Sequence, residues 1–564
     1  MKKKVVTLVT VALIIATTSI FFYSCRKIDE IEKQVNSQSN SNAVIMTSAG
    51  SEGCMEFAPQ TRNPFSVENM DSALQELIDT GEFECDYNLF NIRPTHRYIR
   101  FEPQDSNEYD ELNNDSSLIL FDYPLDRRLI KGGTYYKDPS LSETQTNYQW
   151  CCVEYNHVLP NGISYTDLGD LYLPQQDPEL LQYRETDFDA CIFLLETQAL
   201  KRTGNFDTTQ VNTNYTGDDP TAKKKFKLFP PKWSPKGKIT IFDDRLNRSI
   251  PLEGVRVRAN KWFETRIALT NSNGFFDIGN HFNYPVDYSV KWERPDFHIK
   301  SGGFGQAYFN GPHQKGDWNL DITRSSSGGS SWLFGHVHRA AVRYFYQDIG
   351  GLRRPGQRDF RYWVFDRAGG WHNNSGSQGV NYSELARING KKSEGGDYWA
   401  ADEIFSTTIH ETAHSTHLKI MNTGYLQFSQ VSRIIQESYP IGVEWVITKM
   451  EYKGRGITNY SDFNYNVSAS YPIRYGYQYW YHDNYLTNYT PLFIDLIDNY
   501  NQNGQVFTGL QNGQVNDAVS GYNLSEIEDM LKNVYGLSSL KTKLKANKPS
   551  GVTDSQIDNL IDGF

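Results

Sequence analysis

The chain has 564 residues, a formal net charge of -11 and an apolar fraction of 38%. This length exceeds what one hydrophobic core can organise, so we expect roughly three or four domains. The acidic balance argues against nucleic acid as a partner, because a surface that binds nucleic acid needs clustered positive charge.

The first 25 residues form a predicted export signal. Three lysines at positions 2–4 precede an apolar run from Val5 to Tyr23, and Ser24 and Cys25 follow it. This order resembles the signal of bacterial lipoproteins. The resemblance implies that Cys25 becomes a lipid-carrying N-terminus, which would anchor the protein to the outer membrane or cell surface of a Gram-negative bacterium.

An uncleaved signal anchor is the alternative for this segment, because Phe22 and Tyr23 depart from the small or aliphatic residues usual before such a cysteine. Either alternative exports the rest of the chain. No later run approaches the roughly 20 apolar residues that a spanning helix requires. Residues 26–49 are acidic at first and then polar from Asn36 to Asn42, which predicts a flexible tether.

Residues 50–222 are predicted to form an amino-terminal α+β module of unknown role. Residues 71–78 have the pattern of a short helix. Pro94 to Phe101 alternates apolar and polar residues as a half-buried strand does, and Leu118 to Phe121 predicts a second, shorter strand. The mixture of helix and strand patterns predicts an α+β fold here.

Five cysteines follow Cys25, all before residue 200, and their number is odd, so at least one stays outside an intramolecular pair. The sequence leaves the pairing open. Adjacent cysteines at 151 and 152 are expected to face opposite sides of one strand. The five are Cys54, Cys85, Cys151, Cys152 and Cys191.

Residues 236–322 have the pattern of a β-sandwich, with short alternating strands separated by turns. Strands are predicted at Lys238 to Phe242, Val255 to Ala259 and Tyr288 to Trp292, with a turn rich in Asn and Gly at residues 270–274. The stretch Pro251-Leu252-Glu253-Gly254 and this turn resemble the carboxypeptidase regulatory-like, or transthyretin-like, domain. The resemblance implies a spacer or docking module without chemistry of its own.

Residues 323–331, which read TRSSSGGSS, are predicted to be a linker before a last domain at 332–564. Val337 to Gln347 has the apolar spacing of a helix. A further helix is predicted to begin between Asp402 and Thr407, where side chains offer caps, and to end near Met421 before Asn422-Thr423-Gly424.

This last helix carries the motif His410-Glu411-Thr412-Ala413-His414. Histidines four residues apart lie on one face of a helix, so both can bind the same zinc ion. Glu411 then faces metal-bound water and is expected to act as its general base in peptide hydrolysis. The motif predicts a zinc metallopeptidase.

Zinc needs a third protein ligand and a position that stays open to water. The metzincin pattern is excluded, because His417 and Ile420 replace its glycine and third histidine. About 10 Å of helix separates His417 from His410, which is too far for one ion. His417 is therefore expected to be a surface histidine or a partner of the ligands.

The segment from Glu437 to Trp445 resembles the second ligand helix of gluzincins, the class of thermolysin-like peptidases and large zinc aminopeptidases. In the aminopeptidases the pattern is E-G-F-A-x-x-x-E-[YW], and the resemblance implies that Glu437 is the third ligand. Glu444, on the same helical face, is the alternative ligand. Pro440 departs from the pattern and is expected in the first turn of its helix.

A transition-state oxyanion would need a donor, and the Tyr-rich stretch from Tyr471 to Tyr489 offers several candidates without choosing among them. The candidates are Tyr471, Tyr475, Tyr477, Tyr479, Tyr481, His482, Tyr485 and Tyr489.

Together the patterns predict a multidomain α+β protein: an amino-terminal module, a β-sandwich and a mainly helical, zincin-like domain. Its predicted function is that of an exported, lipid-anchored peptidase acting on proteins or glycoproteins, with Zn²⁺ held by His410, His414 and Glu437. The alternative is a surface protein that binds a glycan or protein and whose zinc site is structural or vestigial.

Overall fold

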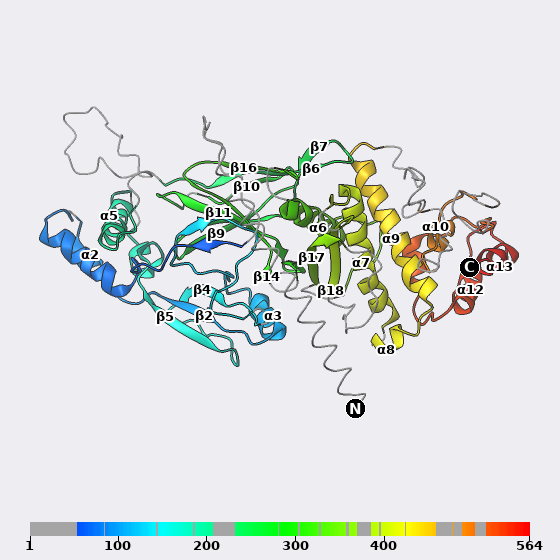
Figure 1. Cartoon of the computed structure of the whole chain (residues 1–564), viewed down its shortest axis with the longest axis horizontal. Helices are drawn as coiled ribbons and strands as arrows, with labels where there is room; N and C mark the ends of the chain where they lie inside the picture. The colour runs from blue at the N-terminus through cyan, green and yellow to red at the C-terminus, as the bar shows by residue number, and fades with distance from the viewer. Residues whose placement is uncertain are drawn as a thin grey trace. The chain divides into compact units, whose positions relative to one another are not determined.

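The computed structural model describes residues 54–83, 85–142, 145–183, 186–206, 232–279, 281–302, 305–325, 329–356, 360–368, 385–393, 396–422, 425–457, 477, 488–501, 503 and 515–564. They belong to one compact unit, Gly50–Phe564, and they combine helices and sheets in a mixed α+β fold (Figure 1). The predicted signal, its Cys25 and the tether lie outside the described residues.

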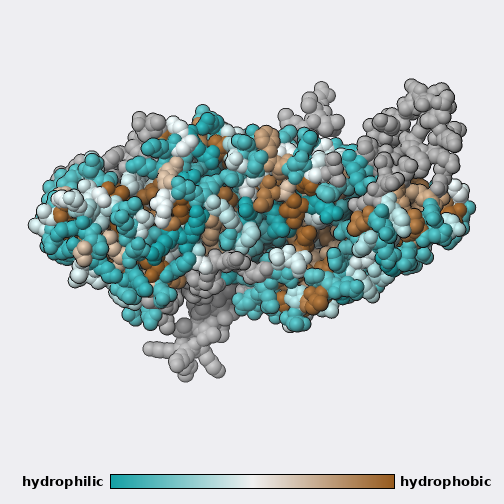
Figure 2. Space-filling view, turned by 180° about the vertical axis from the view of Figure 1, so that it is seen from behind, coloured by the Kyte–Doolittle hydropathy of each residue, from teal (hydrophilic) through white to brown (hydrophobic). Residues whose placement is uncertain are grey.

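No helix in these ranges is long and apolar enough to cross a membrane. On the face seen in Figure 2, hydrophobic residues are interspersed among hydrophilic ones. Scattered exposed apolar residues are normal for a folded protein.

The amino-terminal region contains a three-stranded antiparallel sheet in the order β4-β2-β5, with helices α2 and α5 packed together beside it. Helix α2 contains the predicted helix at 71–78 and begins after Ser66, whose side chain accepts a hydrogen bond from the Asn69 N–H. The elements are β1 Glu56–Phe57, α2 Val67–Asp79, η1 Tyr87–Leu89, β2 His96–Phe101, α3 Ser106–Asn114, β3 Leu129–Lys131, β4 Gln149–Glu154, β5 Tyr165–Leu171, η2 Pro174–Gln176, α4 Pro178–Leu181 and α5 Thr186–Arg202.

The predicted strand at Leu118 to Phe121 is wrong. Of these four residues, only Phe121 pairs with a strand, through an isolated β-bridge to Trp150. Leu118 and Leu120 are buried in a small core beneath the sheet, so their apolar character reflects packing without backbone pairing.

The cysteines follow the strand geometry. Cys151 and Cys152 lie on β4, and their side chains join cores on opposite faces of the sheet, as predicted. A disulfide joins Cys85 to Cys191, which ties the segment after α2 to helix α5. This cross-link closes a long loop, the arrangement in which a disulfide restricts the unfolded chain most.

Two four-stranded sheets follow and share one core. One has the order β10-β6-β16 with β7 on β6, and the other has the order β15-β11-β8-β9. Gly274 is required at the predicted turn, because its φ is +78° and an added Cβ would lie 2.4 Å from the carbonyl oxygen of Ile239. The strands are β6 Lys236–Asp243, β7 Arg248–Pro251, β8 Arg256–Lys261, β9 Glu264–Leu269, β10 Phe275–Asp277, β11 Val286–Lys291, β15 Tyr308–Gln314 and β16 Trp318–Ile322.

A further sheet joins this region to the last third of the chain. Strands β12 (Glu293–Arg294) and β14 (Gly305–Gln306) each pair antiparallel with β13 (Phe297–Ser301). Strand β13 runs parallel to β17 (Phe360–Ala368), which runs parallel to β18 (Leu385–Lys391). Parallel pairs join segments that are distant in sequence, so the sandwich pattern alone does not predict them.

Packing continues across the predicted linker at 323–331. Trp332 of helix α6 (Gly329–Tyr346) packs in the sandwich core, and its indole N–H donates a hydrogen bond to the carbonyl of Phe242 at 2.7 Å. Gly335 lets the helix approach closely, since a Cβ there would lie 2.6 Å from Ile241. One hydrophobic core therefore extends from Ile239 to Ile561.

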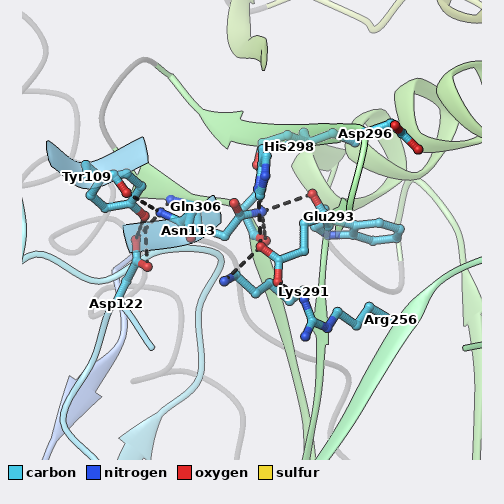
Figure 3. A network of polar contacts seen from close by, with 12 residues as sticks. Tyr109, Asn113, Asp122, Arg256, Lys291, Glu293, Asp296, His298 and Gln306 are labelled. Atoms are coloured by element: carbon cyan, nitrogen blue, oxygen red, sulfur yellow. Dashed lines mark hydrogen bonds and ion pairs between the residues drawn. The ribbon is translucent and has the colours of Figure 1, made fainter. Parts of the chain in front are cut away.

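Buried polar groups lie where the amino-terminal region meets the sheet that contains β12, β13 and β14 (Figure 3). Asp122 accepts hydrogen bonds from the Tyr109 hydroxyl at 2.9 Å and from the Gln306 N–H at 3.0 Å. Glu293 accepts from Arg256 at 2.5 Å and forms an ion pair with Lys291 at 2.8 Å. Each buried carboxylate thus has several donors, the condition under which a buried charge is tolerated.

Helices complete the last third of the chain around α7 and α9, which pack against each other (Figure 1). They are α7 Ala401–Met421, α8 Tyr425–Phe428, α9 Arg433–Gly454, α10 Leu492–Asp495, α11 Leu524–Met530, α12 Leu537–Ala546 and α13 Asp554–Ile561.

Candidate metal centre

Helix α7 carries the histidine motif. It ends at Met421, as predicted, and Asn422 adopts the left-handed conformation at φ 49°. Its start differs from the prediction: the capping residue is Ala400, which has no side-chain oxygen. Neighbouring acids take the capping role, since Glu403 accepts from the Ala400 N–H at 2.7 Å and Asp244 from the Ala401 N–H at 2.8 Å.

Almost every residue of α7 is buried, and Glu411 is one of the two that are not. Two buried tyrosines fix the rotation of the helix. Tyr362 of β17 hydrogen-bonds Thr412 at 2.7 Å, inside the motif, and Tyr344 of α6 hydrogen-bonds Thr416 at 3.0 Å. The motif is therefore held from the sheet side, while Glu411 keeps partial access to solvent.

Helix α9 begins at Arg433, so Pro440 lies in its interior and the expected first-turn position is wrong. A proline there removes one backbone hydrogen bond of the helix. Buried Ile435, Tyr439 and Val443 anchor both sides of the proline in the core. Tertiary packing thus sustains a helix that the local sequence disfavours.

His410, His414 and Glu437 come together as a buried group that could hold a metal ion, each offering one ligand atom within 4.8 Å of the others. Glu437 Oε2 lies 3.4 Å from His414 Nε2 and 3.8 Å from His410 Nε2. The helices run antiparallel here, because the later glutamate, Glu444, meets the earlier histidine. Two histidines and a carboxylate are a donor set suited to zinc.

Glu444 contacts the other ring nitrogen of His410, away from Glu437. Its Oε2 lies 3.1 Å from Nδ1, and its Oε1 accepts a hydrogen bond from the Tyr477 hydroxyl at 2.8 Å. A carboxylate at Nδ1 favours the tautomer with the proton on Nδ1, which leaves the Nε2 lone pair directed toward Glu437. This position suits an orienting partner better than the third ligand.

The charges of the group are strongly coupled. Burial alone would raise the pKa of Glu437, but His414 and His410 hold it well below its usual range. Burial would lower the pKa of His410, yet Glu437 and Glu444 raise it to about 10. His410 is therefore protonated in the absence of a cation, and a metal bound at Nε2 would displace the proton from that nitrogen.

Glu411 is not part of the ligand group. Burial raises the pKa of its carboxyl, and the charges of Glu437 and Glu444 raise it further, against the effect of the two histidines. A raised pKa is the tuning expected of a general base or acid that works near neutral pH.

His417 lies outside the group and is not a surface residue. Its ring is buried between Phe428 and Tyr439, whose ring centroids lie 5.0 and 4.9 Å from its own. Neither ring nitrogen has a hydrogen-bond partner among the residues that the structure describes. Burial lowers its pKa to about 3, so the ring is neutral. The expectation of a surface histidine is wrong, because α9 and α8 cover this face of α7.

Of the Tyr-rich stretch, the structure describes Tyr477 and Tyr489, and the other candidates lie outside the described residues. Tyr489 stacks on His410 at a centroid distance of 6.1 Å. Burial and the nearby Glu437 and Glu411 raise its pKa, so its hydroxyl stays protonated and can donate. Tyr477 is engaged with Glu444 and Tyr489 with Glu437, so each of the two hydroxyls already has a carboxylate partner.

Sequence reasoning missed Arg433, whose Nη2 lies 2.9 Å from Glu437 Oε1. This contact engages Oε1, whereas Oε2 is the oxygen that lies near both histidines. The spacing of four residues on a helix was a usable signal. Tyr362 had no such signal, since only the fold brings β17 to the motif.

Replacing Glu444 with Gln is expected to weaken zinc binding about 10- to 100-fold, because the amide loses the charge that orients His410. Competition with a chromogenic chelator measures the affinity. Tyr477→Phe should produce a smaller loss in the same direction. Equal affinity of the Glu444→Gln and unmodified chains would contradict the orienting role.

None of the protein-family models, curated proteins or solved structures compared with the chain matches it. The functional conclusion therefore rests on the residues of the site.

Proposed function

We propose that the chain is an exported, lipid-anchored zinc metallopeptidase that hydrolyses peptide bonds of protein or glycoprotein substrates. The observation that carries this proposal is the buried group of His410, His414 and Glu437, with partly exposed Glu411 beside it on α7. The finer fold assignment, a transthyretin-like sandwich followed by a zincin-like domain, belongs to the same proposal.

Different residues are assigned to zinc binding and to proton transfer. His410, His414 and Glu437 would hold the zinc ion, which when bound polarises a carbonyl and acidifies water. Glu411 accepts the proton of the attacking water and can deliver it to the leaving amine. Tyr489, which stacks on His410, is the candidate donor to the oxyanion of the transition state.

The surface-binding alternative has a structural or a vestigial zinc site, and the structural form predicts a closed one, because structural zinc is held by four protein ligands. Among the described residues, the group contains three His, Cys, Asp or Glu side chains. A site with three protein ligands leaves a position for water and substrate, which supports a catalytic site over a structural one.

The test is hydrolysis of a peptide library by the full chain, with metal content measured on the same sample. We expect about one zinc per chain and cleavage that stops when a chelator removes the metal and returns when zinc is restored. Stoichiometric zinc without cleavage of any peptide would instead favour the surface-binding alternative.

A further inference from the structure

A basic and aromatic surface lies on the sheet next to the metal helix. Strand β17 alternates, with Phe360, Tyr362 and Val364 buried while Trp363 and Phe365 on the other side are only partly buried. The buried side meets the helices, since Phe360 packs on Phe345 of α6 and Tyr362 bonds Thr412 of α7. The opposite side of this sheet therefore faces away from the metal helix.

Strand pairing places cations beside these rings. Lys300 of β13, Trp363 of β17 and Arg387 of β18 stand side by side in register. The guanidinium of Arg387 lies 5.2 Å from the Trp363 ring centre, and that of Arg367 lies 4.2 Å from the Phe365 ring centre. We call Trp363, Phe365, Arg367 and Arg387 the basic face.

The amino-terminal region covers only one end of this side of the sheet. There Lys300 lies 4.1 Å from the Tyr109 ring centre, and Arg361 pairs with Asp110 at 2.5 Å. Arg367 and Arg387 are exposed beyond it. Lys391 of β18 is neutralised by Asp366 at 2.9 Å, whereas no carboxylate lies within ion-pairing distance of Arg387 in the part of the chain that the structure describes.

The positive charge of the basic face fits a negatively charged partner. A glycan would need free ring faces for its sugars, but guanidinium groups already occupy the faces of Trp363 and Phe365. The Trp363 ring beside the Arg387 guanidinium restricts the orientation of that group, and a guanidinium with a restricted orientation favours bidentate binding of carboxylates. The geometry therefore favours acidic side chains over a carbohydrate.

We propose that the basic face binds an acidic segment of the protein substrate, an inference that rests on the proposed peptidase function. The face lies on the sheet whose other side carries the metal helix. An acidic segment held there would raise the local concentration of the attached peptide near the metal centre, as a second binding site on one ligand does.

The test is fluorescence anisotropy of a labelled decaglutamate peptide with the full chain carrying Glu411→Gln, so that no probe is cleaved. Arg387→Glu is expected to weaken binding about fivefold or more, since it removes one exposed ion pair and adds repulsion. Lys532→Glu is the matched control, because Lys532 is also exposed and the change in net charge is identical. Arg387→Gln should give a smaller loss, and added salt should weaken binding to the unmodified face.

The outcomes separate the two proposals. Equal affinity of the Arg387→Glu and Lys532→Glu chains would overturn the inference about the basic face and leave peptidase activity untouched. Binding of a heparin oligosaccharide through Arg387, without binding of decaglutamate, would overturn it in favour of an anionic glycan. Binding of decaglutamate through Arg387, together with no cleavage of any peptide by the zinc-loaded chain with native Glu411, would reject the peptidase function and keep the acidic-segment site.

Discussion

Replacing Glu411 with Gln is expected to lower peptide hydrolysis by about 10²- to 10⁴-fold, the usual contribution of a general base. The amide cannot accept the proton of the attacking water. Zinc affinity should stay within about twofold of the unmodified chain, because Glu411 is not among the three residues of the ligand group. Steady-state kinetics and chelator competition on the same preparation measure both quantities.

Glu526→Gln is a suitable control, since it makes the same chemical change at an exposed position of α11. The loss in the Glu411 variant should appear in kcat with little change in KM, because the proton transfer belongs to the chemical step. Hydrolysis at an undiminished rate would reject Glu411 as the base.

Removal of the third ligand should have the largest effect on metal binding. Glu437→Gln is expected to weaken zinc binding by more than about 100-fold, beyond the loss caused by an orienting partner. The amide is a poor zinc ligand, and the change leaves Arg433 without the carboxylate that it contacts at 2.9 Å. Activity should fall with the metal and recover only in part at high zinc concentration.

The comparison with Glu444→Gln makes this prediction specific. Both glutamates lie on one face of α9, but Glu437 faces the Nε2 atoms of both histidines and Glu444 faces Nδ1 of His410. A larger loss of zinc in the Glu444 variant than in the Glu437 variant would reverse the assignment. Far-ultraviolet circular dichroism of both variants separates metal loss from unfolding.

Local patterns predicted the helices and strands whose side chains repeat with a clear period. The helix of the histidine motif, the α2 region and the strands at Lys238 to Phe242 and Tyr288 to Trp292 all form near their predicted positions. The strand predicted at Leu118 to Phe121 was wrong, because these apolar residues are buried without forming a strand. The patterns also failed at Pro440, because packing of α9 outweighs the loss of one backbone bond.

For this protein the sequence by itself determined the pair His410 and His414, because a spacing of four residues puts two side chains on one helical face in any helix. The resemblance of residues 437–445 to gluzincins predicted Glu437 or Glu444, seven residues apart on another helix, as the third ligand. The tertiary structure distinguishes the two glutamates, because the offset of α9 along α7 brings Glu437 to the Nε2 atom of His414 and Glu444 to the Nδ1 atom of His410. Only the fold could bring in Tyr362 and the parallel strands, because such contacts depend on pairing between distant segments and leave no local periodicity.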